Sequence, residues 1–377
     1  MTFRRFVKWT GAFSLAAASY LFPVCAVQAQ SGNQSWTSSD QQGSPDGTIN
    51  PTRTSNTHSE SAGRILDKTS VETRGPDGRY IPYSDTEKES IRVNDTTVRN
   101  VERTFGRDSD GRRVLIQQTQ EESRKLPGGE SSVTRTIANP DVNGGMQVIR
   151  RESEQSKQLS PTVRVTRTTV LTPDANGGFS PAVQTEEHET RRSDGTVESK
   201  KSTLLSNGTG GWTLSEVRES TSQQEGNQHR KEERVSRPDS NGNLALVEHT
   251  VNKQDQAGSG ESRDTIETYS TDVPGVAGDN RLQLVQRETI RRSTSAGAQS
   301  IIRQIERPRP GAPGDGLHVT QQSIDTVRPG SDGRAKETHT VLSPDSDGQL
   351  HQVWVDIGTT RDPSAVQVDL GTPAKPK

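Results

Sequence analysis

The stretch VTRTIANPDVNGGMQVIRRE, residues 133–152, joins two runs of β-forming residues through a Pro-Asp-Val-Asn-Gly-Gly segment. The chain returns to this arrangement in VTRTTVLTPDANGGFSPAVQTEE at residues 165–187 and in KEERVSRPDSNGNLALVEHT at residues 231–250. Asn-Gly or Asp-Gly between β-branched runs is the strongest local signal for a β-hairpin, because glycine readily adopts the positive φ that the turn requires. Each stretch therefore predicts a hairpin, and their recurrence predicts a hairpin repeat.

The repeat has a regular step. Successive turn glycines lie 33 residues apart at first, then 32, and the later copies are less regular. Helical repeats of similar length, such as ankyrin, carry a Thr-Pro-Leu-His signature that this chain lacks. We therefore expect about eight or nine β-hairpin units over residues 64–358. The structural turn glycines are Gly78, Gly111, Gly144, Gly177, Gly210, Gly242 and Gly348.

Each unit has a second, variable turn about halfway along, so one unit reads turn, strand, turn, strand. Apolar residues cluster beside the regular turns, as at Met146 and Val148 or at Leu244 and Leu246, whereas the distal halves of the strands are polar on both faces. The predicted fold is all-β, with tandem ~33-residue hairpins forming a long antiparallel meander. We expect it to be partly single-layer, elongated or curled, with an apolar belt near the regular turns.

Two other β architectures fit the pattern less well. A β-solenoid needs inward-facing apolar residues along its whole length, and the polar half-strands do not supply them. An outer-membrane barrel needs an apolar lipid-facing stripe with aromatic girdles, and the chain ends in GTPAKPK rather than in an aromatic strand.

The amino-terminal segment is typical of an exported protein. Residues 1–29 combine Arg4, Arg5 and Lys8 with an apolar run and small residues up to Ala29, which is the plan of a secretory signal peptide. A retained membrane anchor and a lipoprotein at Cys25 are the alternatives. We expect a low-complexity flexible segment at 30–63, the hairpin array at 64–358, and a Pro-rich flexible tail at 359–377. The predicted location is periplasmic, cell-surface or extracellular.

Composition excludes several function classes. The chain has 377 residues, a net charge of −2, and only 4% aromatic residues. Basic residues form no run of five, so nucleic-acid binding is not expected. No P-loop, His-Glu-x-x-His, cysteine pair or Gly-x-Ser-x-Gly occurs, so we expect no enzyme activity and no cofactor.

The regular turns suggest one metal hypothesis. Their Asp-x-(Asn/Asp)-Gly sequences supply oxygen ligands of the kind that calcium prefers, although a third acidic position and a distal glutamate are missing. The competing interpretation is that each aspartate caps the turn backbone. The candidate ligands are Asp141, Asn143, Asp174, Asn176, Asp239, Asn241, Asp345 and Asp347.

These observations lead to two functional hypotheses. The first is an exported, non-enzymatic β-repeat protein with a structural, spacer or surface-interaction role, since stacked repeats give length without a globular core. The second is an extracellular binding module for a glycan or a protein, with calcium at the turns. Both expect an unknown protein or polysaccharide partner and no membrane span after signal cleavage.

Overall fold

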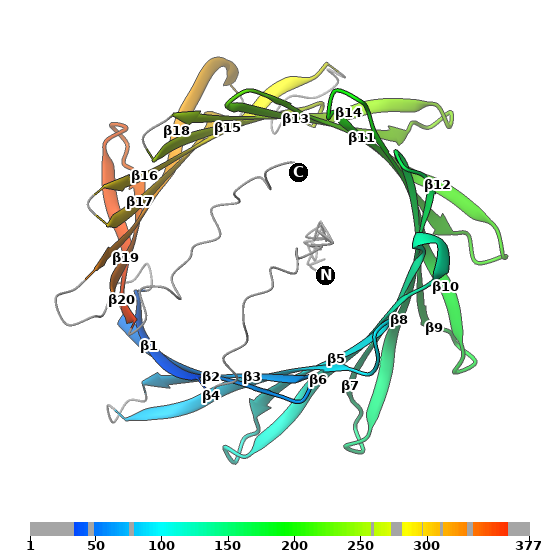
Figure 1. Ribbon diagram of the computed structural model, residues 1–377. Coiled ribbons are helices and arrows are strands. Elements are labelled where there is room, and N and C mark those ends of the chain that lie inside the picture. Colours follow the sequence, from blue (N-terminus) through cyan, green and yellow to red (C-terminus); the bar gives the residue numbers. More distant parts are fainter. Residues whose placement is uncertain are drawn as a thin grey trace, which may run out of the picture.

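The computed structural model is a ring of antiparallel strands, shown in Figure 1 along its axis. The structure describes residues 34–43, 49–74, 79–257, 260–272, 281–295, 297–309, 312–329 and 335–360. All its strands belong to one 20-stranded sheet. Within these residues, no helix is long and apolar enough to cross a membrane.

The strands follow one another around the ring in chain order. The first ten are β1 (Gln34–Gly43), β2 (Ile49–Ser61), β3 (Arg64–Arg74), β4 (Tyr80–Arg92), β5 (Thr97–Arg107), β6 (Arg113–Lys125), β7 (Ser131–Pro140), β8 (Met146–Ser160), β9 (Val163–Pro173) and β10 (Phe179–Arg191). The next ten are β11 (Val197–Ser206), β12 (Trp212–Glu225), β13 (Gln228–Pro238), β14 (Leu244–Ala257), β15 (Glu261–Ser270), β16 (Gln283–Ser295), β17 (Ala298–Arg309), β18 (Ala312–Pro329), β19 (Ala335–Pro344) and β20 (Leu350–Thr360). A single 3₁₀ turn, η1 (Pro127–Gly129), connects β6 to β7.

The first and last strands meet and close the ring. Each strand pairs antiparallel with the next one in the chain, and β1 also pairs with β20 through Ser39 and Thr359. Closure removes the two free sheet edges that an open meander would expose, which is how barrels avoid edge-to-edge association. The predicted meander is confirmed, and its curl is complete.

A row of β-bulges runs around the ring near the regular turns. In every even-numbered strand from β4 to β20, the register skips one residue: Tyr83, Ile116, Ile149, Ala182, Ser215, Val247, Val285, Thr320 and Val353. The first five follow at steps of 33 residues, five positions after each turn glycine. Since a bulge bends its strand and increases the local twist, the row marks a bend in the wall.

Neighbouring hairpins separate beyond this row. The pairing of β4 with β5 ends at Asp85 and Phe105, and that of β12 with β13 ends at Val217 and Ser236, whereas the two strands within each hairpin stay paired up to the regular turn. In Figure 1 these hairpin ends fan outward from the ring. We call the nine hairpin ends between the bulge row and the regular turns the crown, and the continuous wall below them the stem.

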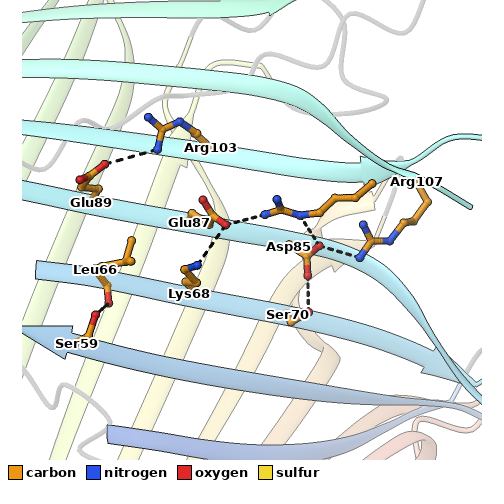
Figure 2. Close-up of polar contacts among 10 residues, drawn as sticks. Ser59, Leu66, Lys68, Ser70, Asp85, Glu87, Glu89, Arg103 and Arg107 are labelled. Carbon is orange, nitrogen blue, oxygen red and sulfur yellow. Dashed lines mark hydrogen bonds and ion pairs between the residues drawn. The ribbon is translucent and has the colours of Figure 1, made fainter. Parts of the chain in front are cut away.

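The two faces of the wall follow from strand alternation and register. Figure 2 views β1–β6 from outside the ring, with strands of the opposite wall behind them, and Asp85, Glu87 and Glu89 of β4 stand on the near, outer face. Their register partners Phe105, Arg103 and Val101 share that face. The alternate positions, such as Lys88 with its partner Glu102, face the lumen.

Several sequence-based expectations can now be located. The apolar belt lies beside the regular turns, in the crown, as predicted. Strands β1 and β2 lie within residues 30–63, where a flexible segment was expected, so the array begins earlier than residue 64. The signal peptide at 1–29, Gly78 and most of the tail at 359–377 fall outside the described residues.

Candidate functional site

The regular turns at the tips of the crown share one hydrogen-bond arrangement. Asp141 Oδ1 accepts from the backbone N–H groups of Asn143 and Gly145, both at 2.8 Å. Gly144 has a φ of 81°, which favours glycine. Asp108, Asp174, Asp239 and Asp345 accept the corresponding pair of bonds in their turns, and Asn207 does so in the turn that lacks the aspartate.

This arrangement supports the capping interpretation of the turns. The backbone amides already use one carboxylate oxygen of Asp141, Asp174, Asp239 and Asp345. No group of three or more His, Cys, Asp or Glu side chains that could hold a metal lies within the part of the chain that the structure describes. The residues at 143, 176, 241 and 347 bind the aspartate through their backbone N–H groups. Calcium at these turns therefore stays a prediction.

One turn carries an additional charged contact. His351 Nε2 lies 2.6 Å from Asp345 Oδ2. Hydrogen bonds from His351 and from the backbone N–H of Gln349 hold the pKa of Asp345 below its ordinary value. Asp345 therefore stays ionised to lower pH than a free aspartate does, and it keeps its capping role there.

The outer face of the stem is a ladder of ion pairs (Figure 2). At the upper limit of the stem, Asp85 accepts a hydrogen bond from Ser70 and another, at 2.8 Å, from Arg107 of the adjoining crown hairpin. Glu87 and Glu89 continue the ladder: Lys68 Nζ lies 3.7 Å from Glu87, and Arg103 lies 3.6 Å from Glu89. The carboxylates of this outer face are thus neutralised by basic side chains or accept from a hydroxyl group, and none of these three is left without a polar partner.

The inner face of the stem is also lined by paired charges. Arg135 of β7 bridges Glu121 of β6 and Glu152 of β8, with N–O distances of 2.5 and 2.9 Å. Further around the ring, Arg292 contacts Asp264 at 2.6 Å, and the Asp264 residue is only 8% exposed. The lumen is thus bounded by a polar wall of alternating sign.

The crown differs from the stem in its outer face. Here apolar residues pair across the hairpins: Phe105 with Leu115, Leu204 with Leu214, Tyr269 with Leu284, and Pro238 with Leu244. Outward apolar side chains occur in every hairpin of the crown. Several of them remain exposed to solvent: Tyr80, Met146, Trp212, Leu244, Leu246 and Leu350.

Aromatic residues gather in the same zone. Six aromatic residues lie in the crown: Tyr80, Tyr83, Phe105, Phe179, Trp212 and Tyr269. Trp36 of β1 and Trp354 of β20 lie outside it. Arginine side chains contact two of the rings, one from Arg113 in the crown itself and one from Arg151 just below the bulge row. The Arg113 guanidinium carbon lies 3.3 Å from the centre of the Phe105 ring, and that of Arg151 lies 4.2 Å from the Phe179 ring. The low overall aromatic content gives no sign of this clustering. Aligning the aromatic positions with the hairpin repeat would have shown that they fall beside the regular turns.

No family model and no curated protein sequence matches this chain. Among solved structures, the chain is similar to the outer membrane protein OpdK from Pseudomonas aeruginosa, with 10% identity, 87% of this chain and 96% of that chain covered, and a TM-score of 0.40. It is also similar to the siderophore receptor PirA from Pseudomonas aeruginosa, with 8% identity, 87% and 80% covered, and a TM-score of 0.49. A third is the copper transporter OprC, with 6% identity, 87% and 80% covered, and a TM-score of 0.42.

Two expectations are corrected. The spacer and the extracellular glycan- or protein-binding module are wrong, because the strands close into a ring around a lumen and do not extend as a stalk with free faces. The expectation of a protein or polysaccharide surface as partner, with no membrane span after signal cleavage, is corrected with it, because it was derived for an elongated array and not for a closed ring. The polar strand halves of the stem favoured an exposed array over a closed barrel.

Proposed function

We propose that this protein is a channel-forming barrel of the bacterial outer membrane, through which ions and small hydrophilic solutes pass. The observation that carries the proposal is the pairing of β1 with β20, which encloses a lumen bounded by polar side chains. Barrels of 16–18 strands already leave an aqueous channel, and this ring has 20 strands. The expected signal peptide at residues 1–29 supports delivery to the envelope, and the proposal needs neither a catalytic group nor a cofactor.

The inner wall suggests what such a channel would pass. Arg135 between Glu121 and Glu152, and Arg303 beside Glu288 at 2.5 Å, place both signs of charge along the lumen. A wall of mixed sign attracts neither cations nor anions strongly, because the fields of adjacent opposite charges cancel. Salt screens what remains beyond a Debye length of about 8 Å at physiological ionic strength. We therefore propose weak ion selectivity and a preference for polar solutes.

Conductance in planar lipid bilayers tests this function. The exported protein, purified from the envelope in mild detergent, is added to one side of a bilayer in potassium chloride. The proposal predicts discrete, ohmic current steps. The matched control is a double variant, Ser39→Pro with Thr359→Pro, which removes backbone donors where the ring closes. The proposal would be contradicted if the folded native protein gave no current steps. It would also be contradicted if the double variant, whose ring no longer closes, gave current steps of the same size as the native protein.

A further inference from the structure

The inner face of the wall is hollowed between β3 and β7. The hollow has a volume of about 440 Å³, which is the size of a small-molecule site. The register of these strands places its charged lining on the lumenal face, together with Lys88. The polar residues that line it from this face include Asp67, Lys88, Asn100, Glu102, Glu121 and Arg135. Carboxylates and basic groups therefore share one hollow that opens to the lumen.

One side of the hollow is already satisfied by contacts within the protein. Arg135 lies between Glu121 and Glu152, with N–O distances of 2.5 and 2.9 Å. Asn100 donates its side-chain amide to the other oxygen of Glu121 at 3.1 Å. Both carboxylate oxygens of Glu121 are thus occupied, and this side of the hollow is a fixed wall.

The other side holds a row of three charges in the order carboxylate, ammonium, carboxylate. Asp67 of β3, Lys88 of β4 and Glu102 of β5 are register partners, so they lie side by side on the inner face. Lys88 Nζ lies 3.5 Å from Glu102 Oε2, which is longer than a charge-assisted hydrogen bond. The Lys88 side chain is 62% exposed, and its ammonium group makes no hydrogen bond to the residues that the structure describes. Its N–H groups are therefore open to a solute.

The two carboxylates of the row also keep open acceptor atoms. Asp67 Oδ1 lies 2.6 Å from His58 Nδ1, and Glu102 Oε2 faces Lys88. Asp67 Oδ2 and Glu102 Oε1 accept no hydrogen bond from any described residue. The row thus presents one open cationic donor between two open anionic acceptors.

An α-amino acid carries the complementary pair of charges at a comparable spacing. Its nitrogen and its carboxylate carbon are separated by roughly 2.5 Å, so its carboxylate can accept from Lys88 while its ammonium group donates to a flanking carboxylate. A solute with a single charge gains one contact and meets repulsion from the rest of the row. A lone carboxylate would lie beside Asp67 and Glu102, and a lone amine would lie beside Lys88. Such repulsion against the wrong ligand is a source of specificity.

We propose that the row of Asp67, Lys88 and Glu102 is a lumenal binding site for zwitterionic α-amino acids. The solute carboxylate contacts Lys88, its ammonium group contacts Glu102 or Asp67, and its side chain takes up the remaining volume of the hollow. The inference rests on the proposed channel function, since it names a class of polar solute that the lumen holds. Exposed ion pairs each contribute little, so the solute binds weakly and can leave again, as passage through a channel requires.

Ligand-observed NMR on the native protein in mild detergent tests the site without requiring conduction. Saturation-transfer titrations at neutral pH compare the dissociation constants of L-alanine, acetate and ethylamine. We expect alanine to bind about fivefold more tightly than either singly charged solute, which is the order of one exposed ion pair. Equal affinities for alanine and for either of the other two would overturn the proposal.

Variants of the row locate the site. Lys88→Gln removes the carboxylate anchor and should weaken alanine binding about fivefold. Asp67→Asn with Glu102→Gln removes both ammonium acceptors and should abolish the preference for alanine over acetate. The matched control is Lys200→Gln on the outer face, where Lys200 is 60% exposed and lies 3.0 Å from Glu219, and it should leave binding unchanged. Unchanged binding in Lys88→Gln, or an equal loss in Lys200→Gln, would overturn the assignment.

The outcomes separate the site from the channel function. Alanine binding without current steps in lipid bilayers would support the site and contradict the channel. Current steps from a native protein that does not bind alanine would overturn the site and leave the channel standing. Circular dichroism on each variant checks that it remains folded.

Discussion

Ser39 of β1 and Thr359 of β20 are register partners, and they join the two ends of a sheet whose strands otherwise pair in chain order. Their pairing predicts that Ser39→Cys with Thr359→Cys forms an intramolecular disulfide under mild oxidation. Cross-strand Cα partners lie within the range that disulfide geometry allows. The expected product is a monomer that migrates differently on non-reducing and reducing gels.

The control for this cross-link is Ser39→Cys with Thr203→Cys, because β11 lies far from β1 around the ring. It should give no intramolecular product. An open, extended meander would give only disulfide-linked dimers with both pairs, and that result would contradict closure.

The repeat and its turns could be predicted from sequence, but the ring could not. Gly111, Gly144 and Gly177 recur at a fixed step and adopt the positive φ that their turns require. Closure depends instead on the twist that accumulates over 20 strands. No single residue in the sequence indicates that accumulated twist. The polar sequence of residues 34–61 also concealed β1 and β2, because their strand conformation comes from pairing with neighbours and not from β-forming side chains.

The crown was only partly predictable. Met146, Val148, Leu244 and Leu246 indicated an apolar belt beside the turns. The bulge at Ile149 and its counterparts were missed, since a bulge shifts register without a characteristic residue type here: the skipped positions range from Tyr83 to Ser215. Whether the apolar belt faces outward or into the lumen could be decided only from the closed ring.

The turn aspartates predict a capping effect that does not require calcium. Asp141→Ala removes two hydrogen bonds to the backbone of one turn and should lower the free energy of unfolding by roughly 1 kcal/mol. Thermal unfolding followed by circular dichroism measures it. The control is Val142→Ala in the same turn, whose side chain is 100% exposed and should have no effect.

The same melts, repeated with EDTA and with millimolar calcium chloride, separate capping from metal binding. We expect identical midpoints for the native protein in both. A midpoint that rises with calcium in the native protein, and not in Asp141→Ala, would assign the turn aspartates as ligands.

The contact between His351 and Asp345 predicts a local pH dependence. The pKa of Asp345 is lowered from 3.8 in the folded protein, first by the hydrogen bond from His351. A carboxyl group with a depressed folded-state pKa stabilises the fold above its unfolded value, and the contribution is lost as pH falls through the folded pKa. His351→Ala should raise the pKa of Asp345 toward 3.8, which carbon-13 NMR of labelled aspartate carboxyls measures. The variant His188→Ala removes a histidine paired with Glu186 and should leave Asp345 unchanged.

The position of Arg135 on the inner face predicts an effect on ion selectivity, if the proposed channel conducts. Arg135→Gln removes a positive charge from between Glu121 and Glu152 and leaves net negative charge in the lumen. The reversal potential in asymmetric potassium chloride should shift toward cation preference. Loss of the two ion pairs of Arg135, which leaves Glu121 and Glu152 without this partner, should also destabilise the protein by roughly 1–3 kcal/mol.

The matched control for Arg135 is Arg99→Gln on the outer face, where Arg99 lies 3.0 Å from Glu122. Both variants remove one arginine from an ion pair in neighbouring strands, so their effects on net charge are equal. Only the inner variant changes the field along the permeation path, because Arg99 and Arg135 lie on opposite faces of the wall and only Arg135 faces the lumen. Equal shifts of the reversal potential in the two variants would contradict the assignment of faces, and no current in either would contradict the channel itself.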